Sequence, residues 1–152
     1  GLLGSTVLAV LMIALAVLLP SRGRANPVVD MERALEEHEF VPFYQPLIDL
    51  RTGAIAGAEV LMRWRKADGS HVPPAMFIPL AESSGLILEM TEAIMVAVRD
   101  DLAHFLAERP RFRISFNLPA AHFKSKTIVR DVREIFAPSP IRLSQIVLEL
   151  TE

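Results

Sequence analysis

Two carboxylates and one side-chain amide stand near the ends of three apolar segments of this chain. They are Glu59 in AIAGAEVLMRW (54–64), Asn117 in RFRISFNL (111–118) and Glu149 in QIVLELTE (145–152). An ionised carboxylate that is buried in such a segment without a partner would be costly. Carboxylate and amide oxygens form a hard ligand set, which suits Mg²⁺, Mn²⁺ or Ca²⁺ rather than zinc. The residue types therefore predict a site for a divalent cation.

The alternation of side chains along a strand places each of these groups on a polar face. Glu59 shares its face with Arg63, whereas Ala58, Val60 and Trp64 take the other face. Each of the three segments keeps one apolar face that suits a covering helix, and directs an oxygen-bearing side chain to the opposite face near its C-terminal end. Catalytic groups collect in this way at the C-terminal strand ends of an α/β barrel.

Arg63 follows Glu59 by four residues on the same face, a separation of about 13 Å at ~3.3 Å per residue. That distance is too long for an ion pair within the strand, but it suits a phosphate that bridges toward the cation. A purely structural interpretation stays open, in which Glu59 and Arg63 have separate partners and Asn117 caps the helix after Pro119.

The segments that must position these groups follow one another in a regular order. They are a helix at 28–39, a hairpin of strands at 41–50 and 54–64, a short helix at 76–83, a long helix at 86–107, a strand at 111–118, a helix at 120–136 and a strand at 145–152. A short turn with Gly53 joins the hairpin, and Gly85 ends the short helix. Strand, helix, strand, helix and strand after the hairpin predict a parallel α/β fold.

The N-terminal segment is uncharged and is apolar without a break over residues 7–19. A signal peptide would carry a basic region before its apolar run, and a buried globular helix is rarely apolar on every face. About 20 apolar residues span the ~30 Å hydrocarbon core of a bilayer. We therefore expect a transmembrane helix at 1–21 and a juxtamembrane linker with a connector helix at 22–39. Arg22 and Arg24 favour a cytoplasmic location for the rest of the chain.

Composition limits the other classes of function. The chain has 152 residues and a formal net charge of -2, with Lys and Arg scattered among acids. No basic stripe is therefore available for binding DNA or RNA. The absence of cysteine excludes disulfides and thiolate metal sites.

Four stretches carry a resemblance to a known family: FYQPLIDLRTGAIAGAEVLMRW, FIPLAESSGLI, ISFNLPAAHF and IVLELTE. In their order and approximate spacing they resemble the EAL domains, bacterial phosphodiesterases of the second messenger cyclic di-GMP. The likeness covers about residues 40–152. The signature triplet is Glu-Val-Leu at 59–61 rather than Glu-Ala-Leu, which leaves the glutamate in place. The resemblance implies a TIM-like (β/α) barrel of the EAL type.

The resemblance also implies roles for individual residues. It makes three of them metal ligands and catalytic residues: Glu59, Asn117 and Glu149. Gln45 and Arg63 match substrate contacts, and Glu152 matches an acid that supports a loop near the metals. The implied cofactor is Mg²⁺ or Mn²⁺, because the family's chemistry is hydrolysis by metal-activated water, which opens the cyclic dinucleotide to its linear form.

The family continues beyond the Glu-x-Thr-Glu motif with an Asp-Asp pair, a lysine and further groups that complete a two-metal site. A complete barrel has roughly 250 residues. We therefore expect residues 40–152 to form an EAL domain that is incomplete at its C-terminus, about half of the barrel, and inactive by itself. The absence of an initiator methionine leads us to expect a chain that begins partway through a longer protein.

The expected function is a phosphodiesterase anchored in the bacterial inner (cytoplasmic) membrane, with its EAL domain in the cytoplasm. Its expected partners are cyclic di-GMP, the membrane and a second copy of the EAL domain in a homodimer, but neither DNA nor RNA. The alternative is a receptor or interaction module with a degenerate EAL domain that does not hydrolyse the nucleotide. Intact Glu59, Asn117 and Glu149 favour the enzyme.

Overall fold

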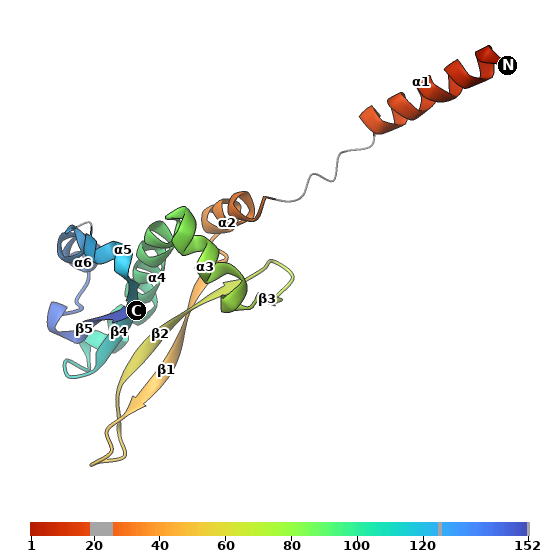
Figure 1. Ribbon diagram of the computed structural model, residues 1–152. Coiled ribbons are helices and arrows are strands. Elements are labelled where there is room, and N and C mark those ends of the chain that lie inside the picture. The colour runs from red at the N-terminus through yellow and green to blue at the C-terminus, as the bar shows by residue number, and fades with distance from the viewer. Residues whose placement is uncertain (19–25, 125, 152) are drawn as a thin grey trace.

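The computed structural model describes residues 1–18, 26–124 and 126–151. In chain order its elements are α1 (Leu2–Leu18), α2 (Pro27–Glu36), β1 (Phe40–Ile48), β2 (Ile55–Arg65), β3 (His71–Val72), α3 (Pro74–Ser84), α4 (Ile87–Ala107), β4 (Arg113–Pro119), α5 (Ala120–Lys124), α6 (Ile128–Phe136), a 3-10 turn η1 (Leu143–Gln145) and β5 (Ile146–Thr151) (Figure 1). The predicted hairpin and the alternating strands and helices that follow it are confirmed.

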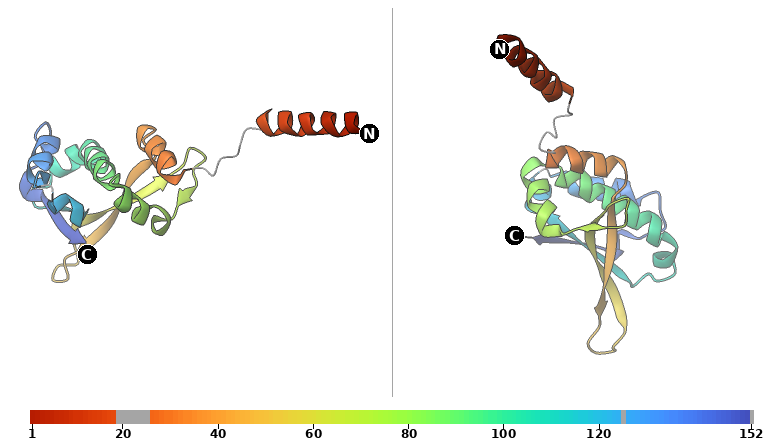
Figure 2. Two further views of the ribbon diagram at one scale, coloured as in Figure 1. Left: turned by 45° about the horizontal axis from the view of Figure 1, so that its top comes forward. Right: turned by 90° about the vertical axis from the view of Figure 1, so that its right-hand side faces the viewer.

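A single sheet joins the strands in the order β1-β2-β4-β5, and the short β3 pairs with β2. β1 and β2 are antiparallel, whereas β2, β4 and β5 run parallel to one another. The parallel pairs are possible because α3 and α4 return the chain between β2 and β4, and α5 and α6 between β4 and β5. Helices α3, α4 and α6 lie on one side of the sheet and leave its other side open (Figure 2).

The core lies between the apolar face of the sheet and helix α4. Val60, Ile114 and Phe116 of the central strands are buried, and so are Met90 and Val98 of α4. Burial of each such side chain stabilises the fold by roughly 1.5–3 kcal/mol. The predicted division of each strand into an apolar and a polar face is therefore confirmed for β2 and β4, and it fixes which face can carry a site.

Helix α2 ends in a left-handed residue that is not glycine. His38 has a φ of 56°. Its N–H donates to the carbonyl of Leu35 at 3.2 Å, and the N–H of Glu39 donates to the carbonyl of Ala34 at 2.9 Å. These two bonds form a Schellman motif. The helix predicted to reach residue 39 therefore stops at Glu36, and the turn brings Glu39 next to β2.

Two further elements differ from the prediction. The helix predicted at 120–136 is divided into α5 and α6, and Lys126, with a φ of 54°, lies between them. A left-handed residue cannot continue a right-handed helix, so the chain changes direction there. β3 was not predicted, because its pairing of His71 and Val72 with the end of β2 involves too few residues to produce a pattern.

The transmembrane helix expected at residues 1–21 is not supported by the described residues. Helix α1 has 17 residues, which at ~1.5 Å per residue measure about 25 Å, less than the ~30 Å core of a bilayer. Within the ranges that the structure describes, no helix is both long enough and apolar enough to cross a membrane. Residues 19–21 of the expected span, with Arg22 and Arg24, lie outside those ranges.

Candidate active site

The three predicted ligands stand on neighbouring parallel strands. Glu59 of β2 is opposite Ser115 of β4, and Asn117 of β4 is opposite Glu149 of β5. Asn117 is two residues beyond Ser115, so its side chain projects from the same face as that of Ser115. The structure therefore gathers Glu59, Asn117 and Glu149 on one face of three neighbouring parallel strands.

Glu59 and Asn117 are in direct contact. The side-chain nitrogen Nδ2 of Asn117 donates a hydrogen bond of 2.6 Å to Oε1 of Glu59. Both residues are half-buried, so this bond explains how an apolar strand accommodates the glutamate. If Asn117 only capped the following helix, this hydrogen bond to Glu59 would not be expected.

Gln45 and Arg63 border the pair on the same sheet. Gln45 of β1 is opposite Glu59 in the antiparallel register, and its side chain is exposed. Nη1 of Arg63 donates to the carbonyl of its neighbour Met62 at 3.0 Å, and its guanidinium lies 6.0 Å from the ring centre of Phe43. Both of these partners are neutral, so Arg63 keeps a positive charge that suits an anionic ligand.

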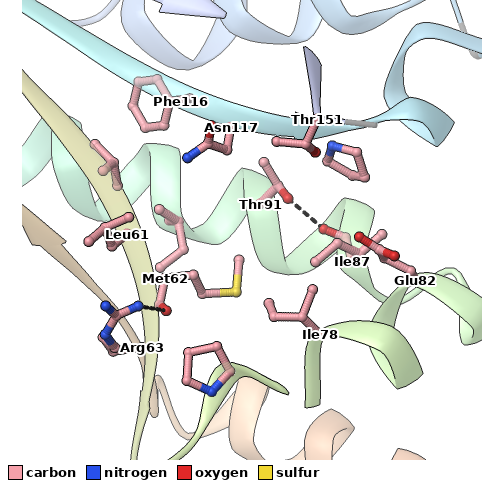
Figure 3. A pocket seen from close by; sticks show the side chains of 14 residues that line it. Leu61, Met62, Arg63, Ile78, Glu82, Ile87, Thr91, Phe116, Asn117 and Thr151 are labelled. Carbon is pink, nitrogen blue, oxygen red and sulfur yellow. Dashed lines mark hydrogen bonds between the residues drawn. The ribbon is translucent and has the colours of Figure 1, made fainter. Parts of the chain in front are cut away.

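A pocket of ≈ 400 Å³ adjoins the ends of β2 and β4 and is bounded by helices α3 and α4 (Figure 3). Its polar lining comes from five residues: Arg63, Glu82, Thr91, Asn117 and Thr151. The hydroxyls of Thr91 and Thr151 are already used, because they donate to the carbonyls of Ile87 at 2.7 Å and Leu118 at 3.1 Å. Glu59 does not line this pocket. We therefore place the chemistry on the open face of the sheet, where the carboxylates are, and regard the pocket as its neighbour.

Glu82 was not predicted as part of the site. It lies near the end of α3 and lines the pocket with Arg63 and Asn117. The rule that found the other residues concerns alternation along strands, and it does not apply to a helix. The one available signal was the position of Glu82 inside the FIPLAESSGLI stretch.

The donor set fits a hard cation in its chemistry. The hydrogen bond uses one oxygen of Glu59 and the nitrogen of Asn117, so a cation would be held by the other carboxylate oxygen, the amide carbonyl and Glu149. Within residues 1–18, 26–124 and 126–151, no group of three or more His, Cys, Asp or Glu side chains could hold a metal ion. The three residues thus supply part of a ligand shell, which water and other groups would complete. Glu152, the expected loop support, lies outside the described residues.

Comparison with known proteins extends over most of the chain. Residues 28–152 match the EAL domain, so the matched region includes α2 from its second residue. The probable cyclic di-GMP phosphodiesterase PdeG of Escherichia coli K12 is 39% identical over 129 residues, which are 84% of this chain and 25% of that protein. The cyclic di-GMP phosphodiesterase PdeL of the same organism is 39% identical over 122 residues, which are 78% of this chain and 33% of PdeL.

A solved structure, the PaMucR phosphodiesterase in complex with c-di-GMP, has the same fold over this region. The TM-score is 0.74 at 30% sequence identity, and the likeness covers 82% of this chain and 51% of that chain. The chain thus spans a quarter to a third of the length of the two curated relatives and about half of the solved one. The expected partial α/β barrel is confirmed, and the match over residues 28–152 shows that the chain belongs to the EAL domain family.

Proposed function

We propose that this chain is part of a membrane-anchored phosphodiesterase that hydrolyses cyclic di-GMP to the linear dinucleotide. The observation that carries the proposal is the contact between Glu59 and Asn117 across two neighbouring parallel strands, on the face that Glu149 shares. The names of the relatives support the substrate, because PdeG and PdeL are both named cyclic di-GMP phosphodiesterases.

The residues divide into two groups by chemistry. Glu59, Asn117 and Glu149 hold the cation through oxygen atoms. Within the described part of the chain Arg63 contacts neutral groups, so its guanidinium binds a phosphate of the substrate, and Gln45 offers an exposed amide opposite Glu59. A bound Mg²⁺ or Mn²⁺ supplies an activated water and offsets charge on the phosphoryl oxygens. Because Arg63 and Gln45 are not cation ligands, substrate binding and turnover are separable by mutation.

The test is the replacement of Glu59 by glutamine in a protein that carries the complete barrel. Glutamine keeps the shape and can still accept from Asn117, but it removes the charge that binds the cation. We expect turnover to fall by roughly 100-fold or more, whereas the affinity for cyclic di-GMP changes little. Glu108→Gln, directly after α4, is a matched control, because the Glu108 carboxylate is exposed and lies 3.5 Å from both Arg109 and His104.

The outcomes separate the candidate functions. Near-normal hydrolysis by Glu59→Gln at ordinary Mg²⁺ levels would show that the ligand assignment is wrong. Nucleotide binding without hydrolysis by the unmodified protein would favour the receptor.

Membrane anchoring rests on helix α1. Its large side chains are strongly exposed, from 55% at Leu15 to 90% at Leu2, and its sequence contains no charged residue. An apolar surface of this kind requires an apolar partner, and we infer that the inner membrane provides it, with the EAL domain on the cytoplasmic side. A reporter fused after Arg24 should then be active in the cytoplasm, and periplasmic activity would contradict the orientation. Analytical ultracentrifugation of the protein with the complete barrel, which measures its molecular mass in solution, tests the expected homodimer.

A further inference from the structure

A buried carboxylate attaches the end of helix α2 to strand β2. Glu39, in the turn after α2, is 8% exposed. Its carboxylate accepts hydrogen bonds from Nε1 of Trp64 at 2.7 Å and from Nη1 of Arg33 at 3.0 Å. Its backbone carbonyl accepts from the N–H of Arg65 at 2.9 Å. Glu39 is therefore bonded to the C-terminal end of β2 through both its side chain and its main chain.

Arg33 of α2 balances the charge of this carboxylate. Besides Glu39, its guanidinium donates to Asp30 at 2.8 Å and to Glu37. The Arg33 guanidinium holds the pKa of the Glu39 carboxyl below its usual range, and the bond from Trp64 acts in the same direction. Removing one partner of a buried ion pair leaves an uncompensated charge. The position of α2 is thus linked to the position of Trp64.

A second set of contacts holds the same part of β2. Nζ of Lys66 lies 3.6 Å from Oδ2 of Asp30 in α2 and 5.1 Å from the ring centre of Trp64. The Trp64 ring also contacts the rings of Phe40 at 5.2 Å and Phe77 at 5.7 Å between centroids. All three residues that follow Arg63 are therefore tied to α2 or to the turn after it.

This attachment matters because the sheet itself holds Arg63 less firmly than Glu59. The pairing of β2 with β4 ends at Val60, so Glu59 is flanked by strands on both sides. Arg63 lies beyond that point and is itself paired only with Val41 of β1 among the described strands, whereas the next two residues, Trp64 and Arg65, also pair with the short β3 at Val72 and His71. The position of Arg63 thus depends on the contacts of the residues next to it.

We propose that Arg33 and Glu39 are positioning residues for Arg63, which place its guanidinium on the open face of the sheet. The inference rests on the proposed function, in which Arg63 contacts a substrate phosphate and Glu59 holds the cation. The link formed by Arg33, Glu39 and Trp64 holds the part of β2 that lies beyond its pairing with β4. It therefore influences Arg63 and the substrate affinity, and it leaves Glu59 and the cation site unchanged. Loss of the link therefore raises KM for cyclic di-GMP and leaves kcat nearly constant.

The experiment compares variants of the protein with the complete barrel. Arg33→Met breaks the ion pair, Arg33→Lys keeps the charge, and Glu37→Gln removes another carboxylate partner of Arg33, at the C-cap of α2. Trp64 is the one tryptophan in the 152-residue sequence. If any tryptophan outside these residues is replaced in the protein with the complete barrel, its fluorescence reports directly on the surroundings of Trp64.

We expect Arg33→Met to raise KM about tenfold with kcat within about twofold of the unmodified value, and to shift the Trp64 emission. Arg33→Lys should recover most of the affinity, and Glu37→Gln should resemble the unmodified protein. In an Arg63→Met background, Arg33→Met should raise KM no further, because both changes act through the same guanidinium.

Two results would overturn the inference. One is a shifted Trp64 emission with an unchanged KM, which would make the link structural only. The other is a KM effect of Arg33→Met that persists undiminished in the Arg63→Met background. If Arg33→Met does not fold, Glu39→Gln keeps an acceptor for Trp64 and answers the same question. Absence of both binding and hydrolysis in the unmodified protein would instead refute the proposed function on which the inference rests.

Discussion

Replacing Gly57 with alanine tests how closely β2 and β4 must approach for Glu59 to meet Asn117. Gly57 is buried and is paired with Arg113 in the parallel register. A Cβ atom at this position would lie 2.5 Å from the carbonyl oxygen of Arg113. Because the obstructing atom belongs to the backbone, no side-chain rotation relieves the clash, and β4 has to move away from β2.

The size of the effect follows from that distance. Carbon–oxygen contacts between strands are about 3.3 Å or longer, so the strands must separate by about 0.8 Å. A shift of this size, carried two residues along β2 to Glu59, would stretch the 2.6 Å bond between Asn117 and Glu59 to beyond about 3.2 Å, the usual limit. Overpacking costs about 1–3 kcal/mol, and each weakened hydrogen bond adds about 1 kcal/mol. We expect a loss of about 2–4 kcal/mol in the free energy of unfolding.

The assay is urea unfolding in mild detergent, followed by the fluorescence of Trp64. Gly53→Ala is the matched control, because Gly53 has a φ of 70° and nothing within 4 Å of a Cβ. That variant suffers only the cost of a left-handed alanine, about 1–2 kcal/mol. If Gly57→Ala lost no more stability than Gly53→Ala, or left hydrolysis by the complete barrel unchanged, the reasoning from close strand approach would be refuted.

Three other predictions concern stability and activity. His38→Gly should stabilise the protein by about 0.5–1 kcal/mol, because glycine adopts the φ of 56° freely; an unchanged urea midpoint would contradict this. Acid should destabilise the protein in two stages. Burial holds the pKa of His122 below its ordinary 6.5, so the unfolded chain binds a proton that the folded chain does not, and stability falls as the pH drops below 6.5. The Arg33 guanidinium lowers the pKa of Glu39 from 4.5, so that contribution is present above 4.5 and is lost as the pH falls further through the folded value. Unfolding curves at several pH values measure both stages, and the first should be absent in His122→Phe. Residues 26–152 alone should show no phosphodiesterase activity above background, since β5 has no partner on its outer side among the described strands; Mg²⁺-dependent cleavage that Glu59→Gln abolishes would overturn this.

Local features of the sequence were sufficient for the faces of the strands and for several boundaries. Glu59, Asn117 and Glu149 could be assigned to one face because side-chain direction alternates along any strand, whatever it packs against. Gly85 could be recognised as the end of α3 because a left-handed φ, here 80°, favours glycine. Both properties depend on a few neighbouring residues, which the sequence states directly.

The limits of several elements needed more than local pattern. His38 and Lys126 adopt a left-handed φ although neither is glycine, so the end of α2 and the break between α5 and α6 gave no clear signal. The apolar N-terminal segment was expected to span a membrane, whereas the described helix α1 stops at Leu18. At His38 and Lys126 the preference of the residue type was a weaker influence than the fold around them.

The contacts between residues far apart in sequence were decided by the tertiary structure alone. The alternation of side chains along each strand gave Glu59 and Asn117 the same kind of polar face, but it could not show that Asn117 donates to Glu59 at 2.6 Å. Nor could it show that Glu39 would be bonded to Trp64 at 2.7 Å. Such contacts depend on strand register and on the direction of a helix after its turn, and these are set by packing of the whole sheet against its helices rather than by any one segment.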